Sequence, residues 1–164
     1  MKKLLSCLFI LASFLLISKR SNAQDYKTAV GLKFGGYENG ISGKYFTTDD
    51  VALEGLIGFR SHGVVFTGLY EVHQVAFGVK ELKFYYGAGA HIGAIGSGLY
   101  RRFNGDDEYY NHSHILLGVD GVLGLEYVIP QSPIAVSLDL NPRAELATGP
   151  FFDIAPGLGI KYTF

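Results

Sequence analysis

The chain has almost no cysteine: the single one, Cys7, lies in an apolar segment near the amino terminus. The residues after that segment therefore cannot form a disulfide or use a thiol as nucleophile or metal ligand. After the same segment, no stretch approaches the about twenty consecutive apolar residues that a membrane-spanning helix needs. If this part of the chain crosses a membrane, it must do so with strands.

Several signatures of catalysis and of nucleic-acid binding are also missing. The sequence contains no glycine-rich phosphate loop, no paired catalytic carboxylates and no metal-ligand spacing. We therefore expect no cofactor and no metal. Without the amino-terminal segment, ten basic residues face fifteen acidic ones, a net charge of −5, which argues against nucleic acid as a partner.

The amino-terminal residues have the features of a secretory signal peptide. Two lysines follow Met1, fourteen largely apolar residues run from Leu4 to Ile17, and Ser21-Asn22-Ala23 places small residues at a cleavage site. Fourteen residues are too few for a spanning helix of about twenty. We predict a signal peptide over residues 1–23 and one mature domain over residues 24–164.

A two-residue alternation runs through the mature chain. It is clearest in residues 152–164, whose even positions are mostly apolar and whose odd positions are small or charged. A period of two indicates a β-strand. The pattern predicts eight strands, at residues 26–35, 41–47, 51–60, 64–73, 82–94, 114–129, 134–141 and 152–164.

The connections between these strands complete the predicted fold. Asn39-Gly40 is a hairpin signal, residues 74–81 form a longer link, and residues 95–113 form one long polar loop. Eight strands joined by turns can close on themselves and leave no free edge. We predict an all-β fold, an eight-stranded antiparallel up-and-down β-barrel.

Parity alone does not decide which row faces inward, because a soluble barrel such as a lipocalin places its apolar row inside. The polar row carries ten glycines, which would weaken a water-facing sheet but leave room for long side chains inside a narrow barrel. Its charges balance, with seven basic and seven acidic residues, as a buried network requires. We therefore predict a transmembrane barrel with a polar lumen. A register shift of one residue would expose these charges to lipid, at about 2–4 kcal/mol for each midplane Arg or Lys.

The predicted lumen network comprises Lys33, Lys44, Glu54, Arg60, Glu71, His73, Lys83, His91, Asp120, Glu126, Asp139, Arg143, Glu145, Asp153 and Lys161. Lys27 completes the seven bases of the polar row.

Aromatic residues on the apolar row predict two belts at the membrane interfaces. Tyrosines lie near one end of the strands and phenylalanines toward the other, and both must fill the belts because tryptophan is absent. The tyrosines are Tyr26, Tyr45, Tyr70, Tyr86, Tyr127 and Tyr162, and the phenylalanines are Phe34, Phe59, Phe66 and Phe152. Two prolines break the pattern. We expect a bulge at Pro156, and we expect Pro142 to mark where its strand leaves the membrane, with Arg143 and Glu145 at the mouth.

With these features the chain resembles the small eight-stranded outer-membrane barrels of Gram-negative bacteria, the OmpA/OmpX-like type of the porin superfamily. The most specific motif is the spacing of Leu158, Ile160, Tyr162 and Phe164 at the carboxyl terminus. In that family this motif is an assembly signal read by the barrel-assembly machinery. The resemblance implies a monomer in the cell outer membrane, with both termini in the periplasm and with outer-membrane lipid and lipopolysaccharide as partners.

Three functions stay open. An eight-stranded interior is just wide enough for its own side chains, so the network predicts a polar plug and a structural or surface-interaction role. A narrow porin-like channel for small solutes is the alternative. His73 and His91 belong to the plug in the first case, and a proton-sensing role for His91 is a further hypothesis.

The long loop holds the remaining candidates. Arg101 and Arg102 suit lipopolysaccharide phosphates, and Asp106 and Asp107 suit a bridging divalent cation, although a run of acids does not form a calcium cage. The third function is a lipid A-modifying hydrolase, because His112-Ser113-His114 offers the residue types. Neighbouring residues on a strand point to opposite faces, so we predict no enzyme.

Overall fold

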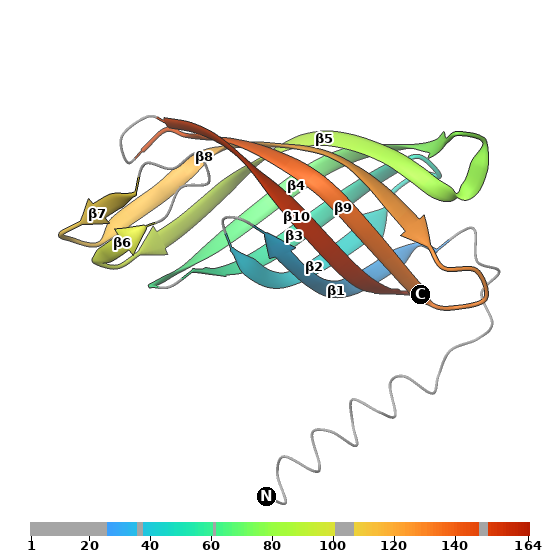
Figure 1. Ribbon diagram of the computed structural model, residues 1–164, viewed down its shortest axis with the longest axis horizontal. Coiled ribbons are helices and arrows are strands. Elements are labelled where there is room, and N and C mark those ends of the chain that lie inside the picture. The colour runs from blue at the N-terminus through green and yellow to red at the C-terminus, as the bar shows by residue number, and fades with distance from the viewer. Residues whose placement is uncertain (1–25, 36–37, 61, 101–106, 148–150) are drawn as a thin grey trace, which may run out of the picture.

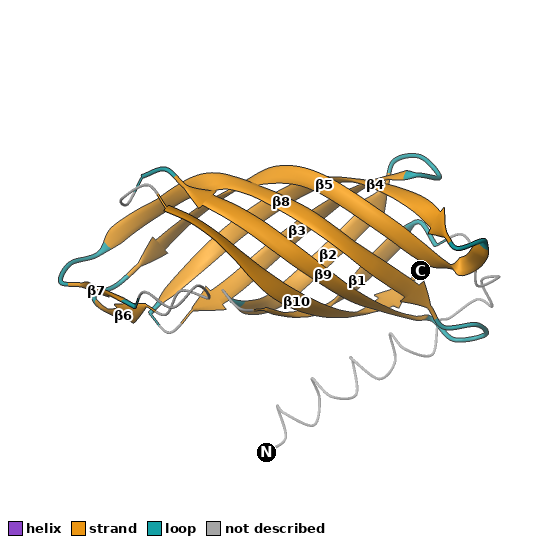
Figure 2. Ribbon diagram, turned by 45° about the horizontal axis from the view of Figure 1, so that its top comes forward, coloured by secondary structure: helices purple, strands orange, loops and turns teal. Residues whose placement is uncertain are grey.

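The computed structural model describes residues 26–35, 38–60, 62–100, 107–147 and 151–164. Eight strands close into a barrel in the order β1-β10-β9-β8-β5-β4-β3-β2 (Figures 1 and 2). They are β1 (Thr28–Gly35), β2 (Asn39–Phe46), β3 (Val51–Arg60), β4 (Gly63–Ala76), β5 (Val79–Ile95), β8 (His114–Val128), β9 (Ile134–Glu145) and β10 (Phe151–Thr163). The prediction of an eight-stranded antiparallel barrel is confirmed. Within the described residues, no helix is long and apolar enough to cross a membrane.

The two ends of the barrel differ. At the terminal end the first and last strands meet, and the Lys27 N–H donates to the Phe164 carbonyl oxygen at 3.0 Å. This end also carries the short links 47–50, 77–78 and 129–133. The opposite end, here called the hairpin end, carries β6 (Gly98–Tyr100) and β7 (Glu108–Tyr110), which pair with each other in the connection between β5 and β8 (Figure 1).

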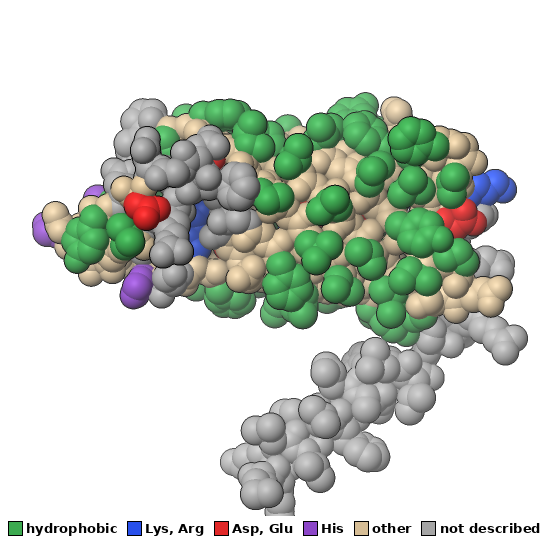
Figure 3. All heavy atoms as spheres, viewed as in Figure 1, with side chains coloured by type: hydrophobic (Ala, Val, Ile, Leu, Met, Phe, Trp, Pro, Cys, Tyr) green, Lys and Arg blue, Asp and Glu red, His purple; other side chains and the backbone are tan. Residues whose placement is uncertain are grey.

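The side-chain orientation is the one that the charge pattern predicts. Leu123, Leu125 and Ile160 are 46%, 38% and 46% exposed on the outside of the barrel. Glu126 and Lys161, on the opposite parity, are buried inside. Figure 3 shows hydrophobic side chains over the wall of the cylinder and charged side chains and histidines gathered toward its two ends. The wall is therefore a band suited to lipid, and the lumen is polar.

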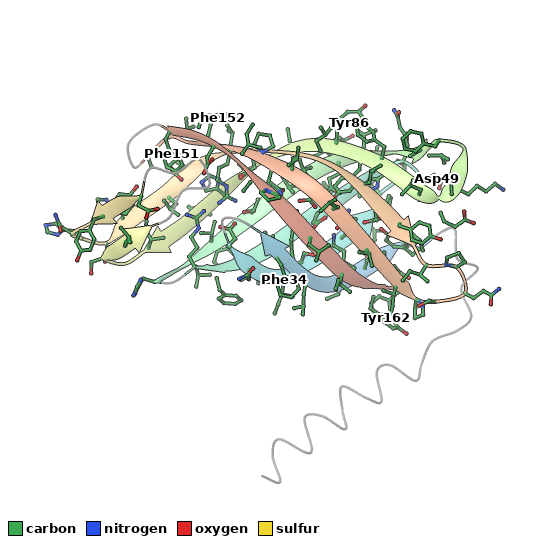
Figure 4. All side chains as sticks on the ribbon, viewed as in Figure 1. Phe34, Asp49, Tyr86, Phe151, Phe152 and Tyr162 are labelled. Carbon is green, nitrogen blue, oxygen red and sulfur yellow. The ribbon has the colours of Figure 1, made fainter. Side chains whose placement is uncertain are left out.

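The aromatic residues lie outside as predicted, with one exception. The four phenylalanines and most of the tyrosines of the two belts are exposed, and Figure 4 places Phe152 toward the hairpin end and Tyr86 and Tyr162 toward the terminal end. Tyr26 is the exception, because it is buried inside the barrel. It precedes β1, so the strand alternation does not fix its direction.

The connection between β4 and β5 is shorter than the sequence suggested. Residues 74–81 do not form a long link; both strands continue to a two-residue turn at Phe77 and Gly78, whose φ angles are 53° and 72°. Two consecutive positive φ values are those of a type I′ hairpin turn. The prediction failed because Phe77 is not a residue type that favours this conformation. The register shifts once here, between Val75 and Ala76.

Two other connections also differ from the prediction. Asn39 and Gly40 do not form a turn, because they pair with Phe34 and Lys33 as the first residues of β2. The predicted polar loop 95–113 contains the β6–β7 hairpin. The buried Tyr110 anchors this hairpin in a cluster with Val65, Ile95 and Leu116. The described residues of this connection, 96–100 and 107–113, therefore form a folded lobe on the barrel rim.

Pro142 does not end its strand. Even-numbered residues of β9 point their backbone groups toward β8, since the Ile134 carbonyl accepts the Ile129 N–H at 2.9 Å. The missing N–H of Pro142 falls on that side, where the β8–β9 pairing is interrupted between Asp120↔Arg143 and Leu123↔Leu140 and then resumes in the same register. Gly121 lies opposite, and a Cβ there would be 2.8 Å from Pro142 Cγ. A glycine thus accommodates the proline ring and the strand continues.

The bulge expected at Pro156 is absent, because the β9–β10 register is constant from Phe151 to Tyr162. Even-numbered residues of β10 direct their N–H groups toward β1, as Phe164 does in donating to the Thr28 carbonyl at 2.8 Å. β1 ends at Gly35, the partner of Gly157. Pro156 lies beyond the last described β1–β10 pair, so its missing N–H removes none of the described hydrogen bonds between these strands.

Candidate functional site

The candidate site is the lumen, where charged side chains from different strands meet. Its first group, the Lys44 cluster, is centred on one buried lysine of β2. The Lys44 ammonium lies 2.9 Å from Glu71 Oε2, 3.1 Å from Glu126 Oε2 and 3.2 Å from Glu54 Oε2. These three carboxylates come from β4, β8 and β3. One cation therefore joins four strands across the barrel.

Each carboxylate of the Lys44 cluster has a second partner. Lys161 of β10 lies 3.1 Å from Glu54 Oε2, and His73 Nε2 lies 3.0 Å from Glu71 Oε2. The hydroxyl of Tyr26 donates to Glu126 Oε1. Buried carboxylates need such additional donors, because burying an ion is costly unless its remaining lone pairs are satisfied.

An aromatic residue and a second lysine extend the network toward the middle of the lumen. Tyr85 stacks on the His73 ring with centroids 5.0 Å apart, and its hydroxyl donates to Asp139 Oδ2 at 2.6 Å. Lys33 of β1 lies 3.3 Å from the other oxygen of Asp139 and donates to Asn141 Oδ1 at 3.3 Å. The Asp139 carboxylate is thus held from two sides.

A second group, the Arg143 cluster, lies nearer the hairpin end. Arg143 donates to both carboxylate oxygens of Glu38, at 2.9 and 3.1 Å, and its Nε donates to Asp120 Oδ1 at 2.5 Å. Arg60 Nε donates to Glu38 Oε2 at 2.8 Å. A bidentate guanidinium–carboxylate pair is the strongest ion-pair geometry in proteins.

Glu38 stands out because it comes from the link between β1 and β2 and not from a strand. Burial raises the pKa of its carboxyl, but the Arg143 and Arg60 guanidiniums outweigh burial and hold the pKa below its usual value. Gly58 makes room for this side chain, since a Cβ there would lie 2.3 Å from Glu38 Cγ. Glu38 is therefore ionised and seated in a recess of β3.

His91 connects the Arg143 cluster to two carboxylates at once. Its Nδ1 lies 2.7 Å from Asp120 Oδ2 and its Nε2 lies 2.9 Å from Glu145 Oε2. The second oxygen of Glu145 accepts the Leu117 backbone N–H at 2.7 Å. All three side chains are buried.

The lumen has apolar side chains toward both ends. At the terminal end, Tyr26, Ala29, Phe46, Ala52, Val128 and Ala135 form one buried cluster. At the hairpin end, Tyr110 and its neighbours form another. Between the two ion-pair clusters lies a cavity of about 30 Å³, whose lining includes Lys33, Asn141 and Arg143. A cavity of this volume has room for a few water molecules, since about 10–15 Å³ is enough for one.

The structure places the predicted lumen residues as follows. Lys33, Lys44, Glu54, Glu71, His73, His91, Asp120, Glu126, Asp139, Arg143, Glu145, Asp153 and Lys161 are buried. Arg60 and Lys83 are half-buried near opposite ends of the barrel, and Lys83 lies 5.2 Å from the Phe46 ring centroid. Arg143 and Glu145 lie inside and not at the mouth, because β9 continues past Pro142. Lys27 is not in the lumen, since it is exposed and lies over the Tyr45 ring.

The sequence analysis did not assign Glu38, Tyr26 or Tyr85 to the network. Tyr26 was expected in the outer belt, and Glu38 precedes the expected hairpin signal at Asn39-Gly40. Only Tyr85 had a usable signal, because its odd position in β5 places it inside. Glu38 and Tyr26 lie outside the strands, where parity gives no direction.

Of the four candidate loop contacts, the structure describes only one. Arg101, Arg102 and Asp106 lie outside the described residues, and Asp107 is exposed. Ser113 is exposed just before β8, and the His114 ring lies against Tyr110 at a centroid distance of 4.7 Å. In the ranges with assigned structure, no hydrogen bond joins Ser113 to a histidine, and no three His, Cys, Asp or Glu side chains are arranged to hold a metal ion.

The residues of the terminal motif face outward at the terminal end. Leu158, Ile160 and Phe164 are exposed, Tyr162 is half-buried, and the Tyr162 and Phe164 rings lie 4.9 Å apart. They form a continuous apolar edge on β10, beside the seam with β1. This edge is accessible from outside the barrel.

No protein-family model and no curated protein matches the chain. Among solved structures, the chain is similar to the N-terminal β-barrel domain of OprF from Pseudomonas aeruginosa, with 20% identity, 84% of this chain and 95% of that domain covered, and a TM-score of 0.60. It is also similar to the Neisserial surface protein A, NspA, with 13% identity, 84% and 93% coverage, and a TM-score of 0.50. Both are small eight-stranded outer-membrane barrels, and at these identities the likeness is one of fold.

Proposed function

We propose that this protein is an integral outer-membrane barrel whose lumen is plugged by its own ion pairs, and that its role is structural or one of surface interaction. The observation that carries the proposal is the Lys44 cluster. One buried ammonium holds carboxylates from three other strands at 2.9–3.2 Å. A solute crossing the lumen would have to separate charges that have no water to replace their partners.

The outer wall supports residence in a membrane. Large apolar side chains are exposed on all eight barrel strands, whereas soluble monomers rarely expose contiguous apolar patches of more than a few hundred Å². An apolar band with aromatic residues near both rims is the surface that a lipid bilayer selects. Lys27, just before β1, and Phe164, just after β10, meet at the same end of the barrel, as an even number of strands requires.

The packing of the lumen supports a plug over a pore. The cavity between the clusters has room for only a few water molecules, and the apolar cluster around Phe46 and Tyr26 lies between the Lys44 cluster and the terminal end. We therefore infer that the barrel does not conduct in its ground state.

The β6–β7 hairpin is the surface that we propose for interaction. Tyr110 anchors it on the rim, and the cross-strand pair Leu99 and Tyr109 is exposed on the lobe. An anchored hairpin displays such side chains with little loss of entropy on binding. Arg101 and Arg102, in the same connection, retain the proposed role of contacting lipopolysaccharide phosphates, and Asp106 and Asp107 that of holding a bridging divalent cation.

Single-channel recording in planar bilayers tests the plug. We expect wild type to give no resolved conductance steps, and Glu54→Gln or Arg60→Gln to give short openings because each removes one charge of a lumen pair. Asp107→Asn, which removes an exposed charge outside the lumen, is the matched control and should behave as wild type. Long-lived steps in the wild type would instead support a narrow channel, the second candidate, which the cavity beside Lys33 and Arg143 favours.

The terminal motif is proposed as an assembly signal. Phe164 also makes seam hydrogen bonds with its backbone, to Thr28 and from Lys27, so deletion would remove both features. Phe164→Ala removes the ring alone, and we expect it to lower the amount of barrel in the outer membrane without affecting export. Phe152→Ala, an exposed ring at the other end of β10, is the control. Equal membrane levels for the two variants would argue against a terminal signal.

A further inference from the structure

The contacts of His91 bear on how many hydrogens its imidazole ring carries in the folded barrel. Both ring nitrogens lie within hydrogen-bond distance of a carboxylate oxygen, at 2.7 Å and 2.9 Å. A neutral imidazole has one N–H donor and one bare acceptor nitrogen. If His91 were neutral, its bare nitrogen would face an oxygen of Asp120 or Glu145 that also only accepts.

Neither carboxylate is free to turn away from the ring. The other oxygen of Asp120 accepts from Arg143 Nε at 2.5 Å, and the other oxygen of Glu145 accepts the Leu117 N–H at 2.7 Å. All of these side chains are buried, so water does not replace a lost partner. Both hydrogen bonds form only when each ring nitrogen of His91 carries a hydrogen and donates it to its carboxylate.

Among the residues that the structure describes, no other group around the ring relieves the mismatch. The groups that face His91 from the packed elements are Thr67 on β4, Gly118 and Asp120 on β8, and Arg143 and Glu145 on β9. The Thr67 hydroxyl accepts from Arg143, which also binds Glu38. Gly118 leaves space for the ring, since a Cβ there would lie 2.5 Å from His91 Cε1.

We propose that His91, Asp120 and Glu145 bind one structural proton, carried as an imidazolium, and that this proton ties β5 to β8 and β9 in the half of the barrel nearer the hairpin. The proton resides on the ring because imidazole is a stronger base than a carboxylate. Losing it leaves one buried carboxylate facing a bare nitrogen. The barrel is thereby stabilised at low and neutral pH and loosened at high pH.

The direction in which stability changes with pH follows from the number of protons bound by the folded and the unfolded states. The unfolded chain releases the imidazole proton near pH 6.5, whereas the folded triad needs a hydrogen on both ring nitrogens to form its two hydrogen bonds. Where the folded state binds this one additional proton, the equilibrium constant for unfolding rises up to about tenfold per pH unit. Below about pH 6.5 both states bind the proton and the contribution is fully present.

Glu145→Gln is the decisive variant. A glutamine at this position accepts the Leu117 N–H with its oxygen and donates its NH₂ to a bare His91 Nε2, while His91 Nδ1–H still donates to Asp120. All three hydrogen bonds then form with a neutral ring, so the variant folds without the proton. We expect the pH slope of unfolding between pH 6.5 and 9 to be smaller by up to one proton than in wild type. His73 is common to both proteins, and its contribution cancels in the difference.

Two measurements decide the proposal on the full chain in detergent micelles. Nitrogen-15 NMR of histidine-labelled protein at pH 7 should show both His91 ring nitrogens protonated in wild type and one bare nitrogen in Glu145→Gln. Urea unfolding from pH 6 to 9 should show the difference in slope, while His112→Gln, which changes an exposed histidine, should keep the wild-type slope. A neutral His91 ring in wild type at pH 7, or equal slopes for wild type and Glu145→Gln, would overturn the proposal.

Discussion

Replacing Lys44 with methionine should destabilise the folded barrel by about 3 kcal/mol. Removing one partner of a buried ion pair costs about 3–5 kcal/mol, because the remaining charge has no compensation. Here the three carboxylates around Lys44 keep second partners: Glu54 keeps Lys161, and Glu71 keeps His73. The Tyr26 hydroxyl still donates to Glu126. The loss is therefore expected at the lower end of the range, and methionine preserves most of the side-chain volume.

Equilibrium unfolding in urea, in detergent micelles, measures this loss. Far-ultraviolet circular dichroism and the gel mobility of unboiled samples report the folded fraction, since a closed barrel migrates faster than its boiled form. Lys27→Met is the matched control, because Lys27 is exposed outside the barrel and its removal should leave stability close to that of wild type. Lys44→Met combined with Glu126→Gln removes one orphaned charge as well, and it should recover part of the loss.

The reasoning would be refuted by a Lys44→Met barrel whose stability lies within about 0.5 kcal/mol of wild type, the usual range of surface substitutions. The reasoning would also be refuted if the double variant Lys44→Met with Glu126→Gln were less stable than each of the two single variants. In that case the carboxylates would be satisfied without the lysine, and the lumen would be wetter than the structure indicates.

The remaining predictions concern three other positions. Glu38 has a lowered pKa, so its contribution to stability is present above about pH 4.5 and is lost as the pH falls through the folded value; acid titration of unfolding should show this loss in wild type and not in Glu38→Gln. Tyr85→Phe removes the hydrogen bond to Asp139 and should cost about 1.5–3 kcal/mol in urea unfolding, as bonds to charged groups do. Phe77 is 88% exposed with φ 53°, so Phe77→Gly should relieve the about 1–2 kcal/mol cost of this conformation and raise the urea midpoint.

The strand alternation predicts the face of a side chain only within the strands. A period of two assigns each residue of a strand to one face, and the balance of charges on one row decides which face is inside. This is why residues such as Lys44, Glu126 and Lys161 were assigned to the lumen. The outward direction of Leu123 and Ile160 was predictable for the same reason.

The pairing within the lumen was not predictable from alternation. Parity gives the face but not the height of a side chain along the barrel axis, which depends on strand tilt and register. Lys44 meets Glu126 across the lumen for this reason, and nothing in either local sequence indicates it. The errors at Tyr26 and Phe77 have a related origin, because both lie at strand ends, where neither parity nor turn propensity decided the conformation.

Three ion pairs of the lumen connect parts of the barrel that are not neighbours in the sheet. Lys44 on β2 binds Glu126 on β8, Arg143 on β9 binds Glu38 beside β2, and Lys161 on β10 binds Glu54 on β3. The members of these pairs are 82, 105 and 107 residues apart in the chain. Opposite walls face each other only after β1 and β10 have met, so we expect these three pairs to form after closure and to be absent from earlier states. Interactions that are absent from the transition state slow unfolding and leave the folding rate nearly unchanged. The polar lumen therefore acts chiefly by keeping a closed barrel closed, while the outward apolar band favours its insertion into lipid.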